Sequence, residues 1–93
     1  MQWLLGQMVT SKQGRDHGHH YVIVKTEDKC CFLADGRKAA VVNPKKKNYK
    51  HLQGTLTYSK EIGEKLILNQ LPTDAEVREF LNNHWPKNGQ KEE

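Results

Sequence analysis

Side chains that can bind a phosphate chain lie close together between residues 12 and 20. Lysine and arginine carry fixed positive charges, and histidine can donate a hydrogen bond to an anion. Gly14 and Gly18 bracket the middle of this segment and can adopt a positive φ, so the chain can turn tightly there. The segment therefore predicts a turn that presents cations to a polyanion. Its candidate contact residues are Lys12, Arg15, His17 and His19.

A second basic segment follows Pro44. Lysines bind phosphates as point charges without base preference, so such a run suits a nucleic-acid backbone. A lysine run alone is more often a solvated loop, but the nearby basic turn favours a contact surface. We expect these lysines to contribute little to folding. The remaining candidate contact residues are Arg37, Lys38, Lys45, Lys46, Lys47, Tyr49, Lys50 and His51.

Two residues in these segments invite a closer interpretation. Tyr49 lies among the lysines, and two roles stay equally open: its ring stacks on an unpaired base, or it covers the core. Arg15 lies between the two glycines, so we expect its side chain to be held more firmly than those of the lysine run. Its planar guanidinium could bind a phosphate through two hydrogen bonds or stack on a base.

Metal binding and catalysis find little support in the sequence. His17, His19 and His20 are too close together for a structural zinc site, and the adjacent Cys30 and Cys31 form no CxxC pair. Neighbouring strand residues point to opposite faces, so we expect one cysteine in the core and one outside it, with no disulfide between them. No base–orienter pair or oxyanion hole is indicated. We therefore expect no metal, no cofactor, no catalytic residue and no enzymatic activity.

The charge is unevenly distributed along the 93 residues, whose net charge is +4. Residues 1–51 carry a net charge of +6, and residues 52–93 carry a net charge of −2. A basic half beside a mildly acidic half suggests a polyanion-binding unit with a non-binding attachment. The low hydrophobic content of 35% fits one small domain. With no membrane-length apolar run and no signal-peptide core, we expect a cytoplasmic protein.

Short segments of alternating polarity and strong turn signals predict the elements that position these residues. Asp35-Gly36 is a hairpin signal, Ser59 can cap a helix, and Thr73 with Glu76 fits a capping box. Strands are predicted near 7–12, 20–26, 30–34, 37–42 and 55–58, and helices near 59–69 and 73–83. Short strands joined by tight turns favour a small closed or nearly closed barrel.

The apolar positions of the two predicted helices have two open interpretations. They could pack on each other or on the barrel, or they could form a docking surface for a protein partner; they are Ile62, Leu66, Val77, Phe80 and Leu81. The expected organisation is an RNA-binding barrel over residues 1–58, a two-helix appendage over 59–83 and a flexible tail over 84–93.

The first predicted hairpin resembles the KOW motif, a strand–loop–strand element of ribosomal proteins and transcription elongation factors. Over about residues 6–55 the order of features is similar to the archaeal and eukaryotic "fourteen-e" family of large-subunit ribosomal proteins. The matching pieces are Gly6–Val9, Gly14–Gly18, Tyr21–Val24, Phe32–Gly36 and Pro44–Leu52. The size and the helical end resemble small KOW-domain RNA-binding proteins of Gram-positive bacteria. The histidine-rich first loop and the C-terminal helices depart from the ribosomal family.

This resemblance implies an SH3-like barrel that binds ribosomal RNA through its loops without catalysis. We therefore expect a mainly β fold, an SH3-like small barrel with two short C-terminal α-helices, in a monomeric, ribosome-associated RNA-binding protein. A ribosomal or other protein is a further expected partner for the helices, and no membrane is expected. The alternative is an SH3-like protein-interaction or transcription-associated module whose barrel binds a polypeptide. The uneven charge favours RNA.

Overall fold

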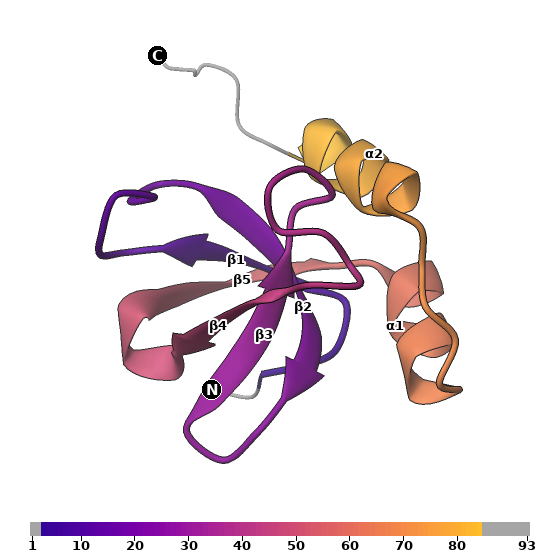
Figure 1. Ribbon diagram of the computed structural model, residues 1–93, viewed down its shortest axis with the longest axis horizontal. Helices are drawn as coiled ribbons and strands as arrows, with labels where there is room; N and C mark the ends of the chain where they lie inside the picture. Colours follow the sequence, from indigo (N-terminus) through magenta and orange to yellow (C-terminus); the bar gives the residue numbers. More distant parts are fainter. Residues whose placement is uncertain (1–2, 85–93) are drawn as a thin grey trace.

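A five-stranded antiparallel sheet, followed by two helices, makes up the fold (Figure 1). The computed structural model describes residues 3–84. The elements are β1 (Gln7–Ser11), β2 (His20–Thr26), β3 (Cys30–Ala34), β4 (Lys45–Asn48), the 3-10 helix η1 (Tyr49–His51), β5 (Leu52–Tyr58), α1 (Lys60–Ile67) and α2 (Asp74–His84). The strand order is β4-β3-β2-β1-β5.

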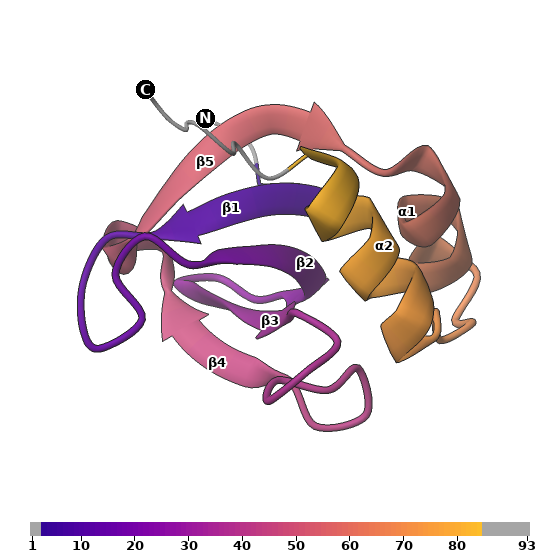
Figure 2. The same cartoon turned by 90° about the horizontal axis from the view of Figure 1, so that it is seen from above.

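The sheet is bent but open. β4 and β5 are its two edges, and Figure 2 shows them on opposite sides of the curved sheet. The expected closure into a barrel is therefore corrected to a small β-rich domain with an open sheet. A strand pairs with the next only while their backbones stay within hydrogen-bonding distance. Here η1 intervenes between β4 and β5, and β5 runs on to pair with β1 instead.

Several predicted elements are confirmed. β2 and β3 have the predicted bounds, and β1 ends one residue earlier than expected. Ser59 caps α1, because its hydroxyl accepts a hydrogen bond from the Ile62 amide at 3.1 Å. The capping box of α2 is formed: the Thr73 hydroxyl accepts from the Glu76 amide at 3.0 Å, and the Glu76 carboxylate accepts from the Thr73 amide at 2.9 Å.

The predicted strand over residues 37–42 is wrong, because this segment is a loop. Its backbone amides bond to side chains instead of to a neighbouring strand. The Asp35 carboxylate accepts from the amides of Arg37 at 2.8 Å and Ala39 at 3.1 Å. The Asp74 carboxylate, from the start of α2, accepts from the Val41 amide at 2.8 Å. These acceptors satisfy the donors that a sheet ladder would otherwise need.

The strand missing from the prediction is β4, which contains the lysine run. Lys45, Lys46 and Lys47 pair with Leu33, Phe32 and Cys31 in that order. β4 forms an edge of the sheet, where lysines discourage pairing with another chain. The run is therefore not a solvated loop, and successive lysines point to opposite faces of the sheet.

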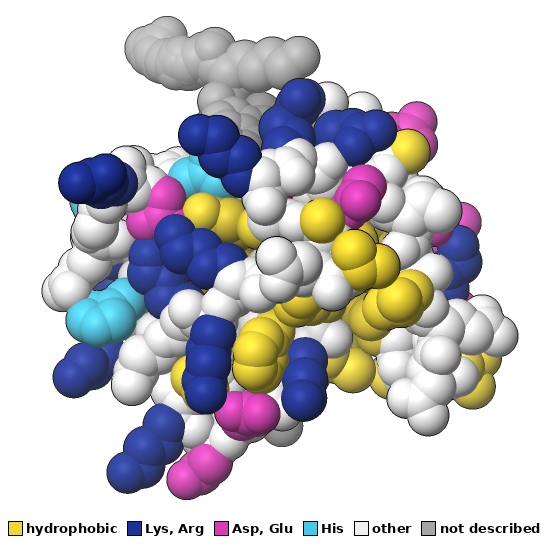
Figure 3. All heavy atoms as spheres, in the orientation of Figure 1, with side chains coloured by type: hydrophobic (Ala, Val, Ile, Leu, Met, Phe, Trp, Pro, Cys, Tyr) yellow, Lys and Arg dark blue, Asp and Glu magenta, His cyan; other side chains and the backbone are white. Residues whose placement is uncertain are grey.

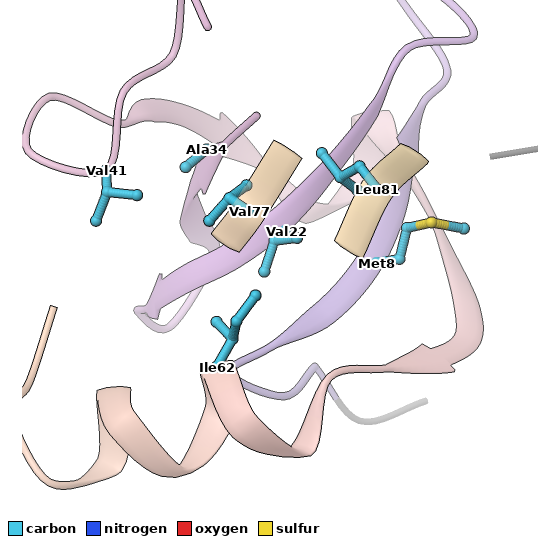
Figure 4. Packing of buried hydrophobic residues seen from close by; sticks show 7 residues of the cluster. All are labelled: Met8, Val22, Ala34, Val41, Ile62, Val77 and Leu81. Atoms are coloured by element: carbon cyan, nitrogen blue, oxygen red, sulfur yellow. The ribbon is translucent and has the colours of Figure 1, made fainter. Parts of the chain in front are cut away.

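Two hydrophobic clusters lie on the two faces of the sheet. The first is formed with the helices, and Figure 4 shows its side chains converging between sheet and helices: Met8, Val22, Ala34, Val41, Ile62, Val77 and Leu81. The second lies within the bend of the sheet: Val9, Tyr21, Ile23, Cys31, Leu33, Ala39 and Leu52. Of the two interpretations of the apolar helix positions, the structure shows packing on the sheet for Ile62, Val77 and Leu81.

Candidate nucleic-acid interface

The loop between β1 and β2 is held by its own backbone. The Gly18 amide donates to the Ser11 carbonyl at 2.8 Å, and the His19 amide donates to the Asp16 carbonyl at 2.8 Å. Gly14 and Gly18 adopt φ values of +90° and +87°, in the region that favours glycine. The loop is thus a tight turn, as predicted, and it leaves the side chains of Lys12, Arg15 and His17 exposed.

The Asp16 carboxylate joins this loop to β4. It accepts hydrogen bonds from the Ser11 hydroxyl at 2.8 Å, the Tyr21 hydroxyl at 2.7 Å and the ammonium groups of Lys45 at 2.7 Å and Lys47 at 2.8 Å. Burial by itself would raise the pKa of Asp16, but these four hydrogen bonds outweigh it and hold the pKa well below its usual range. The carboxylate stays ionised and locks the loop against the edge strand.

The three lysines of the run differ in exposure and in their contacts with the Asp16 carboxylate. Lys47 is only 12% exposed and also donates to the Gln13 carbonyl at 3.1 Å, so it belongs to the structure of the loop. Lys45 is 45% exposed although it bonds to Asp16. Lys46, at 62% exposure, faces away from Asp16 and lies beside the Phe32 ring, with its ammonium group 5.8 Å from the ring centroid. The expectation that all three lysines are solvated is wrong for Lys47, and we therefore predict that Lys47 contributes to folding.

Arg15 also differs from expectation. Its side chain has no hydrogen-bond or ion-pair partner within residues 3–84, whereas Lys45 and Lys47 are held by Asp16. The glycines fix the backbone of the turn, but nothing in the described part of the chain fixes the guanidinium. An exposed arginine without a partner remains available to a ligand.

The loop over residues 35–44 lies opposite the first loop, and a groove of about 750 Å³ separates them. The groove brings together five of the predicted contact residues: Arg15, His19, Arg37, Lys38 and Lys45. Asp16, Tyr21 and Asp35 also line it and were not predicted as site residues. Asp35-Gly36 was interpreted as a hairpin signal, which hid the capping role of this carboxylate.

The Asp35 carboxylate organises the second loop from within the groove. Besides its two amide donors, it lies 2.8 Å from Nε2 of His19. Burial alone would raise the pKa of Asp35, but the amides of Arg37 and Ala39 and the His19 ring lower it overall. Both carboxylates in the groove are therefore ionised and already hydrogen-bonded.

The helix α2 holds the same loop from outside. Asp74 binds the Val41 amide, and the Arg78 guanidinium donates to the Gly36 carbonyl at 2.6 Å. Gly36 has a φ of +76°, and its backbone packs directly against the first turns of α2. No local sequence signal marks these contacts, because the partners lie more than thirty residues apart.

The remaining predicted residues lie on or beside β4 and η1. Tyr49 stacks on Trp3 with ring centroids 4.9 Å apart, and its hydroxyl donates to the Glu27 carbonyl at 2.8 Å. Tyr49 also packs against the second hydrophobic cluster. Lys50 is exposed on η1, and His51 is half-buried, with an Nδ1 that has no hydrogen-bond partner within residues 3–84. These contacts match a lid on the core and leave base stacking by Tyr49 a prediction.

Lys and Arg side chains are grouped on one part of the face shown in Figure 3. Lys and Arg side chains gather over the part that carries β4 and the first loop, whereas hydrophobic and uncharged surface continues toward α1. Lys12, Arg15, Arg37, Lys38 and Lys50 have no ion pair within residues 3–84. The arrangement can therefore attract a polyanion, while Lys47 and Asp16 maintain the loop geometry.

Other chemistry has little structural basis in the described residues. Residues 3–84 contain no group of three or more His, Cys, Asp or Glu side chains placed to hold a metal ion. The predicted placement of the cysteines is confirmed, with Cys31 buried and Cys30 on the other face. Burial raises the pKa of Cys31 to about 12, and desolvation with the Glu27 hydrogen bond raises that of Cys30. Neither thiol is activated as a nucleophile.

Comparison of the sequence with protein-family models and with curated proteins found no match. Within residues 3–84, no helix is both long and apolar enough to cross a membrane.

Proposed function

We propose that the chain is a non-enzymatic RNA-binding protein that acts in the cytoplasm and contacts phosphates through its two basic loops. The observation that carries this proposal is the grouping of cations without ion pairs around the groove and η1. The nearest acids, Asp16 and Asp35, are already hydrogen-bonded and offset the charge only in part. Lysine and arginine arranged in this way bind a phosphate chain with little sequence preference.

A ribosomal-protein-like KOW domain with an SH3-like fold is the finer form of the proposal, with ribosomal RNA as the partner. The tight first hairpin and five short antiparallel strands support it. This chain would differ from a closed barrel in its open sheet and in the two helices packed on that sheet. Sedimentation of a cell lysate through a sucrose gradient, probed for this protein, tests the ribosomal part: the protein should travel with ribosomal particles.

Salt titration of binding to single-stranded RNA tests the RNA-binding part. If the five loop and η1 cations reach phosphates, namely Lys12, Arg15, Arg37, Lys38 and Lys50, the logarithm of the binding constant should fall with that of salt concentration at a slope of roughly −3.5. Lys38→Ala should make the slope shallower by about 0.7. Lys60→Ala, which also removes an exposed lysine but from α1, should leave it unchanged. A slope near zero, or tighter binding to an uncharged peptide, would favour a protein-interaction module instead.

A further inference from the structure

The groove between the first loop and the loop over residues 35–44 has the dimensions of a ligand site. Its volume of about 750 Å³ lies within the range of small-molecule sites, roughly 300–1,000 Å³. Arg15 lies on one wall, and Arg37 and Lys38 lie on the other. Both walls are tied down, the first by Asp16 and the second by α2, so the groove is present before any ligand arrives.

The electrostatics of the groove favour an anion. Arg15, Arg37 and Lys38 have no side-chain partner within residues 3–84. The carboxylates inside are ionised and already hydrogen-bonded: Asp16 accepts four hydrogen bonds, and Asp35 accepts two amide bonds and contacts His19. An entering anion therefore meets free cations at the rim and no unpaired carboxylate within.

The inner surface of the groove suits a flat aromatic group. Tyr21 and Ala39 lie at its inner surface, and the His19 ring meets the Tyr21 ring edge-on, with centroids 4.6 Å apart. Pro44 supplies apolar surface on the second wall. A phosphate alone would need only the cations, so the apolar surface of Tyr21, Ala39 and Pro44 points to a ligand that joins an anion to a flat ring. A nucleotide is such a ligand.

We propose that this groove holds one unpaired nucleotide of RNA, with its phosphate between Arg15 and the Arg37–Lys38 pair and its base against Tyr21, Ala39 and Pro44. The inference rests on the proposed RNA-binding function and adds a substrate class to it. A paired base cannot enter, because its face is stacked and its edge is engaged. The chain would therefore prefer RNA with a bulged or looped-out nucleotide over a continuous duplex.

Binding to three RNA hairpins tests this proposal. The first hairpin carries one bulged nucleotide, the second has an abasic residue in the bulge, and the third is fully paired. The wild-type protein should bind the bulged hairpin roughly tenfold more tightly than the other two, because contact between a base and apolar or aromatic surface stabilises binding by about that factor. Equal affinity for the bulged and abasic hairpins would overturn the base-binding part.

Asn43→Trp is the variant that separates the groove from the general phosphate surface. Asn43 is exposed and lines the groove, so a tryptophan there fills the site without changing the charge. Asn43→Trp should lose the preference for the bulged hairpin but keep the salt-dependent binding of the paired one. Gln70→Trp, an exposed substitution beyond the end of α1, should keep both. A bulge preference that survives Asn43→Trp would overturn the groove assignment.

NMR titration of the wild-type protein keeps the test independent of how the variant folds. The amide signals of His19 and Ala39 should shift clearly more with the bulged hairpin than with the abasic one, which keeps the phosphate but lacks the base. If all three hairpins bind equally with a steep salt dependence, the groove proposal fails and RNA binding stands. If no hairpin binds at low salt, the proposed function itself fails.

Discussion

The ammonium group of Lys47 lies 2.8 Å from Oδ1 of Asp16, a residue 31 positions earlier in the chain. This ion pair joins β4, the edge of the sheet, to the loop that carries Arg15. Asp16 is only 15% exposed, and Lys45 binds its other oxygen. The position of the loop that carries Arg15 therefore depends on this ion pair.

Substitution of Lys47 should lower the stability of the protein, whereas substitution of Lys46 should leave it almost unchanged. Lys47→Ala removes a donor to Asp16, Ser11 and Gln13, so we expect the free energy of unfolding to fall by about 1–3 kcal/mol. Lys46→Ala should change it by less than about 0.5 kcal/mol, because its side chain is largely exposed. Urea denaturation of both variants measures the difference. Equal destabilisation would contradict the division of the lysine run.

The Asp16 network should make stability depend on pH. Because the folded-state pKa of Asp16 is lowered, the folded protein binds fewer protons than the unfolded chain near the unfolded pKa of about 3.9. Asp16 therefore adds stability above that pH, and this contribution is lost as the pH falls below it toward the folded value.

Asp16→Asn isolates this contribution. The variant should be less stable than the wild type by about 2 kcal/mol or more at about pH 7, and the difference should shrink between about pH 5 and pH 2. Urea denaturation across this range is the measurement. Asp28→Asn, in the exposed turn between β2 and β3, is the matched control and should change stability little at any pH. A constant difference between wild type and Asp16→Asn would rule out the ionic role.

Local patterns predicted most of the fold. The β-branched run of β2, the short apolar β3 and the capping residues Ser59 and Thr73 act over a few neighbouring residues, so the sequence reveals them directly. The lysine run was predicted to lie outside any strand, because the charge pattern of a segment does not reveal which strand it pairs with. Its strand conformation comes from pairing with β3.

The loop over residues 35–44 was missed for a related reason. Its apolar residues Ala39 and Val41 are buried, as strand residues would be, but carboxylates bind its amides. Asp74 lies 33 residues away from Val41, and no local pattern connects them. Residue types alone predicted the cations of the candidate site. The groove that brings these cations together depends on the long-range hydrogen bonds, which the sequence does not reveal.

Asp74 should control the order of this loop. Asp74→Ala removes the acceptor for the Val41 amide, which lies at 2.8 Å, so we expect stability to fall by about 1–2 kcal/mol and exchange of that amide with solvent to accelerate. Asp74→Asn keeps an oxygen acceptor at the same position and should retain most of the protection. Hydrogen exchange followed by NMR distinguishes the two. Unchanged protection of Val41 in Asp74→Ala would show that α2 does not hold the loop.

Gly36 and Gly18 provide a matched pair that tests how closely α2 packs on the loop. Both have a positive φ, +76° and +87°, so alanine costs about 1–2 kcal/mol at either position for conformation alone. At Gly18 a Cβ atom would meet nothing within 4 Å. At Gly36 it would collide with the Asp74 carbonyl oxygen and lie 2.7 Å from Cγ of Arg78.

Gly36→Ala should therefore destabilise the protein by more than about 3 kcal/mol, whereas Gly18→Ala should show only the conformational cost. The backbone oxygen of Asp74 cannot move without shifting the first turn of α2, so the clash cannot be relieved by a side-chain rotation. Chemical denaturation gives the two free energies, and hydrogen exchange should show faster exchange in α2 only for Gly36→Ala. If Gly36→Ala and Gly18→Ala lower the free energy of unfolding by the same amount, α2 moves aside at no energetic cost. In that case α2 does not hold the loop over residues 35–44 in place.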